Sequence, residues 1–198
     1  KGTLWEGGIR VPTIIEWPST ITRPRTSSVA GNTCDILPTL LDLAGVTRPA
    51  DAPPLDGISL RALLEGKPFE REKPMGFWDY PARGRPVRSS DLLKQLAAEQ
   101  KAGTERPSSE LHPMEGQIEP ELVPDIQLGH AAWMEGSFKL HRLVRKERAA
   151  SYQLFDLEKD RAEKTDLAKS MPEQVERMEK GLADWQKSVI NSYKGGDY

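Results

Sequence analysis

The sequence predicts an α/β segment followed by a small α+β part, in which one long helix packs on an antiparallel sheet. Residues 10–17, RVPTIIEW, have the β-branched and apolar composition of a short buried strand. Residues 130–144, HAAWMEGSFKLHRLV, contain two alternating apolar runs around a turn, which is the pattern of a hairpin. From Pro172 onward, apolar residues recur three and four positions apart, which indicates an amphipathic helix.

The α/β segment combines the strand with a helix. Pro12 places strand 10–17 at the edge of a sheet or at the start of its own strand. In the stretch TCDILPTLLDLAGV, Asp35 is the predicted N-cap and Gly45 the predicted C-terminal stop. The apolar residues of this helix fall on one face: Ile36, Leu37, Leu40, Leu41 and Ala44.

The α+β part contains three or four predicted strands and the long helix. GFWDY (76–80) and SYQLFDL (151–157) have strand patterns on either side of the hairpin. Pro172 is favourable in the first turn of the helix, and such a helix needs a sheet face to cover. Its apolar stripe consists of Val175, Met178, Leu182, Trp185 and Val189.

A long excursion over residues 81–127 carries no clear strand pattern. A short helix is predicted within it at 90–100, with an inward face made of Leu92, Leu93 and Leu96. The composition turns strongly charged before this region, so we place a domain boundary near residue 70. The predicted domains are therefore 1–69 and 70–198.

Composition excludes several classes of function. The 198 residues include 28 Lys+Arg and 30 Asp+Glu, a net charge of -2, which gives no reason to expect nucleic-acid binding. No apolar run approaches the roughly 18 residues that a membrane helix needs. The single cysteine, Cys34, excludes a disulfide within the chain and an all-cysteine metal site.

No complete catalytic constellation is visible in the residues. Cys34 lies in a helix-start pattern, which favours a small packed residue over a nucleophile. The histidines lack helical metal-site spacing; His141 is interpreted as a surface or rim residue, and His130 as either structural or pocket-lining. Lys1 precedes a tight turn, where it is either a solvated lysine or a point charge for an anion.

Four stretches, in order, resemble the type I, formylglycine-dependent sulfatases. KGTLWEGGIRVPTIIEWP resembles the family's segment of a lysine, an aromatic residue, Glu-Gly-Gly and a strand. The other three stretches are TCDILPTLLDLAGV, PPLDGISLRALLEG and YQLFDLEKDRAEKTDLAKSMPEQVERM. In the last stretch, Arg161 and Asp166 stand where the family usually has Pro and Asn. Within the family the chain looks closest to bacterial enzymes of the arylsulfatase or N-acetylgalactosamine-6-sulfatase type.

This resemblance implies roles for particular residues. Lys1 matches the family's lysine that contacts the sulfate oxygens, so it is the predicted catalytic residue, whereas Glu6 and Arg10 are expected to hold the turn and strand. Cys34 is followed by Asp-Ile-Leu and does not match the formylglycine motif, Cys-x-Pro-Ser-x-Arg. The family's calcium ligands match nothing in this chain, so calcium and formylglycine are expected from residues outside it, with no metal site within it.

The resemblance also implies the architecture. Residues 1–69 are expected to be the end of an alkaline-phosphatase-like α/β domain. Residues 70–198 are expected to be the smaller C-terminal subdomain, an antiparallel sheet packed by the terminal helix. Because that subdomain borders the substrate pocket in the family, His130 and the excursion are the candidate substrate contacts.

The predicted function is hydrolysis of a sulfate ester, of a sulfated carbohydrate or an aryl sulfate, by a longer enzyme whose C-terminal portion is this chain. The portion alone is expected to be inactive, and its expected partner is the preceding part of the same enzyme. By family habit, a periplasmic or secreted location is expected. The alternatives are a phosphonate or phosphodiester hydrolase of the same superfamily and a non-catalytic interaction module.

Separation from the rest of such an enzyme has a structural consequence. Strand 10–17 is expected to have unpaired edges because its sheet partners lie elsewhere. An exposed apolar patch is then expected at Ile14, Ile15, Leu37 and Leu41.

Overall fold

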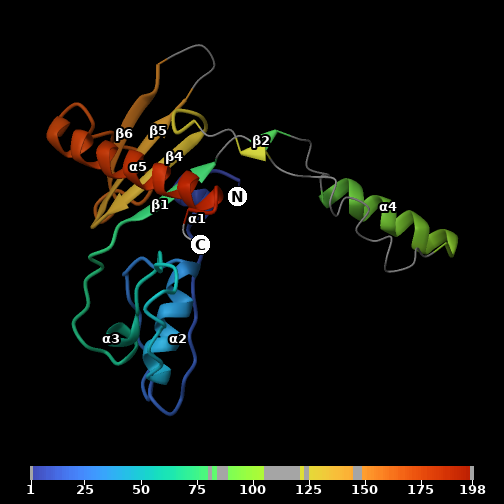
Figure 1. The fold of residues 1–198 in the computed structure, drawn as a ribbon, viewed down its shortest axis with the longest axis horizontal. Coiled ribbons are helices and arrows are strands. Elements are labelled where there is room, and N and C mark those ends of the chain that lie inside the picture. The colour runs from blue at the N-terminus through green and yellow to red at the C-terminus, as the bar shows by residue number, and fades with distance from the viewer. Residues whose placement is uncertain are drawn as a thin grey trace. The chain divides into compact units, whose positions relative to one another are not determined.

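The computed structural model describes residues 2–79, 82–83, 89–104, 121–122, 125–144 and 149–196. These residues form two compact units, one made of Lys1–Asp79 with Gly129–Tyr198 and one made of Tyr80–Leu128 (Figure 1). The domain boundary predicted near residue 70 stays a prediction.

The first unit contains the predicted antiparallel sheet. Its four strands are β1 (Met75–Asp79), β4 (His130–Glu135), β5 (Phe138–Leu143) and β6 (Ser151–Asp156), in the order β1-β4-β5-β6. All three neighbouring pairs are antiparallel, and β4 and β5 form the predicted hairpin. Gly136 adopts a φ of 58° in the hairpin turn, a left-handed conformation that glycine adopts without steric cost.

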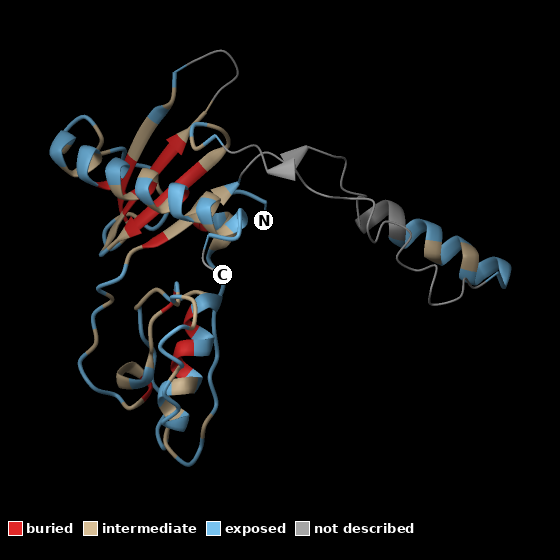
Figure 2. Ribbon diagram, in the orientation of Figure 1, coloured by how far each residue is buried: buried red, intermediate tan, exposed pale blue. Residues whose placement is uncertain are grey.

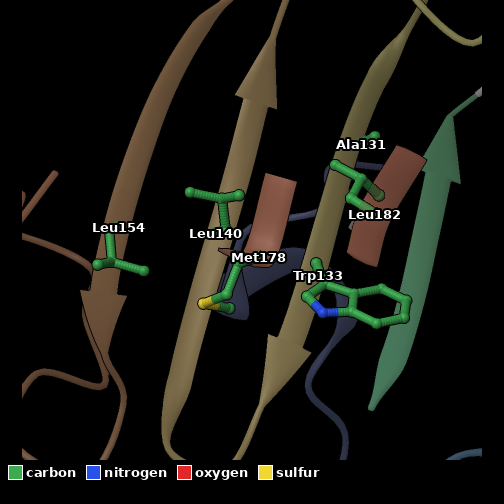
Figure 3. Close-up of a cluster of buried hydrophobic side chains, with 6 residues drawn as sticks. All are labelled: Ala131, Trp133, Leu140, Leu154, Met178 and Leu182. Atoms are coloured by element: carbon green, nitrogen blue, oxygen red, sulfur yellow. The ribbon is translucent and has the colours of Figure 1, made fainter. Parts of the chain in front are cut away.

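Helix α5 (Pro172–Tyr193) lies across one face of this sheet, as its apolar stripe predicts (Figure 2). Met178 and Leu182 are buried against strand residues in the core (Figure 3). The strand residues of this cluster are Ala131, Trp133, Leu140 and Leu154. Gly76 allows close packing, because a Cβ there would lie 2.3 Å from the ring of Trp185. This face of the sheet therefore holds the apolar core, and it also contains a buried hydrogen bond from Arg142 of β5 to Gln186 of α5, at 3.0 Å.

Residues 10–17 do not form the predicted strand, although Arg10 has an extended backbone and a turn follows at 18–20. A strand needs a hydrogen-bonded neighbour, and no described strand pairs with this segment. Ile14 and Ile15 are 92% and 48% exposed, in agreement with the predicted apolar patch.

Helix α2 (Ile36–Ala44) forms where predicted, with Asp35 at its N-cap position, but the Asp35 side chain makes no capping hydrogen bond to this helix. A short 3-10 turn, η1 (Thr33–Asp35), precedes it, and Asn32 is the residue that caps this turn. Asp35 is instead fully buried and accepts hydrogen bonds from the Asn32 and Ile58 amides and from Arg71. Gly45 ends the helix in a left-handed conformation, as predicted.

The apolar face of α2 is largely exposed. Pro38 and Thr39 are the buried residues of the helix. Thr39 Oγ1 accepts a hydrogen bond from the Leu60 amide, just before the short helix α3 (Arg61–Leu64). Of the two helix residues in the predicted apolar patch, Leu37 is exposed and Leu41 is half-buried. The most exposed apolar residues of the helix are Ile36, Leu37 and Leu40.

The second unit contains helix α4 (Ser89–Ala102) and a strand pair. The pair joins β2 (Ala82–Arg83) to β3 (Glu121–Leu122), which the sequence did not indicate. Helix α4 includes the predicted helix, but Leu93 is 65% exposed and does not point inward as expected. Among the helices that the structure describes, none is long and apolar enough to cross a membrane.

Candidate functional site

The opposite face of the sheet carries a buried group of charged and aromatic side chains. It is covered by residues 2–9, which we call the Glu-Gly-Gly turn, and by the loop that follows β6. The turn includes α1 (Glu6–Ile9), whose first hydrogen bonds run from the Gly8 and Ile9 amides to the Trp5 carbonyl. A Cβ at Gly8 would lie 2.2 Å from the Thr3 carbonyl oxygen, so this compact turn requires glycine there.

Five residues make up this buried group, which we call the polar cluster: Glu6, His130, Lys139, His141 and Glu163. They come from α1, β4, β5 and the loop after β6. Lys139 and His141 alternate along β5 and therefore share a face of the sheet, and both are 0% exposed.

Lys139 forms the centre of the charge arrangement. Its Nζ donates to Glu6 Oε1 at 2.9 Å and lies 3.1 Å from Glu163 Oε1. Arg10 supplies a second, more exposed cation, with Nη1 3.5 Å from Glu6 Oε2. A buried ammonium is stable only when it is paired and hydrogen-bonded, and this one lies between two carboxylates.

Glu163 connects the loop to the turn. Its Oε2 accepts the backbone N–H of Glu6 at 2.6 Å, which satisfies an amide that a helix start leaves without an intrahelical partner. Glu163 has a φ of 52°, the one positive φ outside glycine among the described residues. Burial acts to raise the pKa of Glu163, but the hydrogen bonds from the Glu6 amide, His141 and Lys139 outweigh this effect. The net result is a lowered pKa, so the carboxylate is ionised at neutral pH.

The two histidines form a hydrogen-bonded chain that ends on Glu163. His141 Nε2 lies 2.7 Å from Glu163 Oε1, and His141 Nδ1 lies 2.9 Å from His130 Nε2. Burial lowers the pKa of His141 to about 4, against the opposing effect of Glu163, so the ring is neutral at pH 7. Burial also lowers the pKa of half-buried His130.

The tautomers of both rings follow from this chain of bonds. An ionised carboxylate only accepts, so the proton of neutral His141 lies on Nε2 and its Nδ1 is an acceptor. His130 must then donate from Nε2, which leaves the His130 Nδ1 with an unshared electron pair. The network thus assigns His130 as a hydrogen-bond acceptor through Nδ1.

Trp5 covers the histidine chain. Its ring stacks on His141 with centroids 4.1 Å apart and planes 24° apart. It also lies 5.9 Å from the ring of His130 and meets Phe155 edge-on at 5.7 Å. The stacking removes His141 from water and contributes to the lowered pKa of that ring.

The structure brings some of the predicted site residues together and leaves others outside its description. Lys1 lies outside the described residues, so its catalytic role stays a prediction. His130 lies at the half-buried end of the polar cluster. Glu6 does hold the turn, as expected. The prediction of His141 as a surface or rim residue is wrong, because the Glu-Gly-Gly turn covers the face that strand alternation alone suggested was open.

Sequence reasoning missed Lys139 and Glu163. A signal was present in β5, where Lys139 and His141 occupy alternate positions on one face of the strand. Two ionisable residues on one face of a central strand indicate either a solvated face or a paired buried site. Only the folded chain shows that Glu163, 22 residues beyond His141, supplies the counter-charge.

The described residues do not provide a site for calcium or formylglycine. Among them, no group of three or more His, Cys, Asp or Glu side chains is placed to hold a metal ion. Cys34 is exposed and lacks the sequence context of a formylglycine precursor. The polar cluster also contains no nucleophile, so its chemistry is to fix charges, protons and the position of the turn.

Comparison with known families identifies the first part of the chain. Residues 1–90 match the family model described as N-sulphoglucosamine sulphohydrolase, C-terminal. Residues 1–90 of this chain therefore resemble the C-terminal portion of a sulfatase. The match includes the Glu-Gly-Gly turn, α2, α3 and β1.

Curated sulfatases are also similar to part of this chain. Human (Homo sapiens) steryl-sulfatase is 45% identical over 67 residues, which cover 34% of this chain and 11% of the relative. Human N-acetylgalactosamine-6-sulfatase is 39% identical over 72 residues, covering 36% of this chain and 14% of the relative. The chain therefore spans a small fraction of the length of these relatives. The bacterial character expected from the sequence stays a prediction.

A solved structure, the phosphonate monoester hydrolase of Agrobacterium radiobacter, also matches. The alignment covers 79% of this chain and 24% of that one, with 21% identity and a TM-score of 0.39. A likeness at this level does not establish the alkaline-phosphatase-like assignment of residues 1–69, which stays a prediction. The antiparallel sheet with its terminal helix is observed directly.

Proposed function

We propose that this chain is the C-terminal part of an enzyme that hydrolyses sulfate esters. The observation that carries the proposal is the match of residues 1–90 to a sulfatase family model. The Glu-Gly-Gly turn supports it, because the turn is compact and held by a buried ion pair, as a segment that presents a catalytic group must be.

In this proposal Lys1 is the catalytic residue within the chain. Its ammonium contacts the sulfate oxygens and neutralises charge that develops on the sulfuryl group and the leaving oxygen. A compact point charge suits a tetrahedral anion that presents several oxygens. Lys1 precedes Trp5, the first residue of the turn that touches the polar cluster, by four positions in the sequence.

His130 is the proposed substrate contact. The hydrogen-bond chain through His141 to Glu163 leaves the Nδ1 of His130 as an acceptor, and the residue is only half-buried. An acceptor of this kind suits the hydroxyl donors of a sulfated carbohydrate. An aryl sulfate without hydroxyl groups would not use it.

Calcium and formylglycine, which the sulfatase family generally uses, are proposed to come from residues outside this chain. The substrate class is a sulfated carbohydrate or an aryl sulfate, and the partner of this chain is the preceding part of the same enzyme. The 198-residue chain alone is then expected to be inactive.

The test compares the product of the complete reading frame with the 198-residue chain, using 4-nitrophenyl sulfate and the matched 4-nitrophenyl phenylphosphonate. We expect the complete protein to release nitrophenol from the sulfate and the chain alone to release none. In the complete protein, Lys1→Met should lower kcat by about 10²- to 10³-fold, the effect of removing one group that stabilises transition-state charge.

Other outcomes would contradict the proposal. Turnover of the phosphonate alone would favour the phosphonate or phosphodiester hydrolase alternative. If the complete protein hydrolyses neither of these compounds and no sulfated monosaccharide, the result would favour the non-catalytic module. Unchanged kcat in the Lys1→Met variant would refute the role of that lysine.

A further inference from the structure

The Glu-Gly-Gly turn is fixed to the sheet by three contacts of different kinds. Lys139 Nζ bonds Glu6 Oε1 at 2.9 Å, and Glu163 Oε2 accepts the Glu6 amide at 2.6 Å. The Trp5 ring stacks on His141 at 4.1 Å between centroids. All three contacts involve two consecutive residues of the turn. An ion pair, a backbone hydrogen bond and a ring stack together restrain both the position and the orientation of that stretch.

The apolar core of the sheet does not account for this arrangement. The core lies on the other face, where α5 places Met178 and Leu182 against Leu140. A buried ion pair adds little net stability compared with apolar residues of similar volume. The best-attested use of a buried polar group is to select one arrangement among several similar ones. The polar cluster therefore has the properties of a device that specifies geometry.

We propose that Lys139, through its two carboxylate partners Glu6 and Glu163, is a positioning residue that sets where the Glu-Gly-Gly turn presents Lys1. This inference rests on the proposed function, since it assigns the C-terminal sheet a part in catalysis at the same site. Lys139 does not touch the substrate in this scheme. It acts through Glu6.

The geometry shows how the restraint reaches the start of the turn. Lys139 holds the Glu6 side chain while Glu163 holds the Glu6 amide, so the residue is fixed at both of its polar groups. Gly8 packs against the Thr3 carbonyl so closely that no side chain fits between them. Residues 3–8 therefore form one compact turn. A misplacement of about 1 Å in a catalytic group can cost about 100-fold in rate.

The experiment uses the complete protein with Lys139→Met, the conservative Lys139→Arg, and Lys180→Met as a matched control. Lys180 is an exposed lysine of α5 that bonds only Asp184 among the described residues, at 2.7 Å. Two quantities are measured: hydrogen exchange of the peptide spanning residues 2–9, and kcat and KM for 4-nitrophenyl sulfate per folded molecule.

We expect exchange in the turn to be at least about tenfold faster in Lys139→Met than in the control. We expect kcat to fall about 10- to 100-fold with little change in KM, because the lost interaction acts in the transition state. Lys139→Arg, which can pair with both carboxylates, should recover most of the lost kcat. A purely structural role would lower the folded fraction but leave kcat per folded molecule unchanged.

If Lys139→Met does not fold, Glu6→Gln serves as the second variant, because it keeps an acceptor oxygen for Lys139 and removes only the charge. Turn exchange equal to that of the control, or a kcat within twofold of wild type, would overturn the proposal. A wild-type protein that hydrolyses no sulfate ester would refute the proposed function instead. In that case the exchange measurement still decides whether Lys139 fixes the turn.

Discussion

The buried His141 predicts a specific loss of stability in mild acid. In the unfolded chain the pKa of histidine is 6.5, whereas burial lowers that of folded His141 to about 4. Between these values the unfolded chain binds a proton that the folded chain rejects, so stability falls as pH drops from 6.5 toward 4. One pKa unit corresponds to 1.36 kcal/mol, so the full loss is about 3 kcal/mol.

The variant that isolates this effect is His141→Gln, whose side-chain amide can still donate to Glu163 but does not titrate in this range. Urea unfolding followed by circular dichroism gives the free energy of unfolding at pH 7.5, 6.5, 5.5 and 4.5. Wild type should lose about 2 to 3 kcal/mol more than the variant over this interval. His130, whose pKa is also lowered by burial, adds a loss of the same sign to both proteins. Parallel curves for the two proteins would refute the assignment of a neutral, buried His141.

Two further predictions concern packing and a second buried ion pair. Gly76→Ala would place a methyl group 2.3 Å from the Trp185 ring, so we expect a loss of about 1 to 3 kcal/mol, seen as a lower Tm; an unchanged Tm would contradict the packing of α5 on β1. Arg71→Met would leave the fully buried Asp35 unpaired and should cost about 3 to 5 kcal/mol in urea unfolding, whereas the exposed Arg61→Met should cost about 1 kcal/mol or less. Equal losses for the two arginine variants would show that Asp35 does not depend on its partner.

The C-terminal sheet and its helix could be predicted from the sequence because the information is local. Alternation in residues 130–144 and the three-and-four spacing after Pro172 reflect the periods of a strand and a helix, and each element packs on the other. The strand expected at 10–17 has an equally clear composition. It does not form because a strand is defined by its neighbour, and none is present among the described residues.

The polar cluster could be predicted only in part. Glu6 was expected to hold the turn, together with Arg10, from the resemblance to the sulfatases. Lys139 gave a signal in its strand, but its partners lie 133 and 24 residues away, and no local pattern encodes such distances. His141 was misjudged because strand alternation shows which residues share a face, whereas tertiary contacts decide whether that face meets water.

The two faces of the sheet carry different kinds of interaction. On one face, α5 buries apolar side chains, an interaction that is strong but tolerates small shifts because it has no direction. On the other face, the contacts are short and directional, and two of them, at 2.6 and 2.9 Å, end on Glu6, the residue that begins α1. An apolar contact there would hold the turn with less defined orientation. Under the proposed function, residues 2–9 present a charged group to a reacting anion. Such a segment benefits more from directional contacts, and the four-stranded sheet supplies them where residues 2–9 meet it.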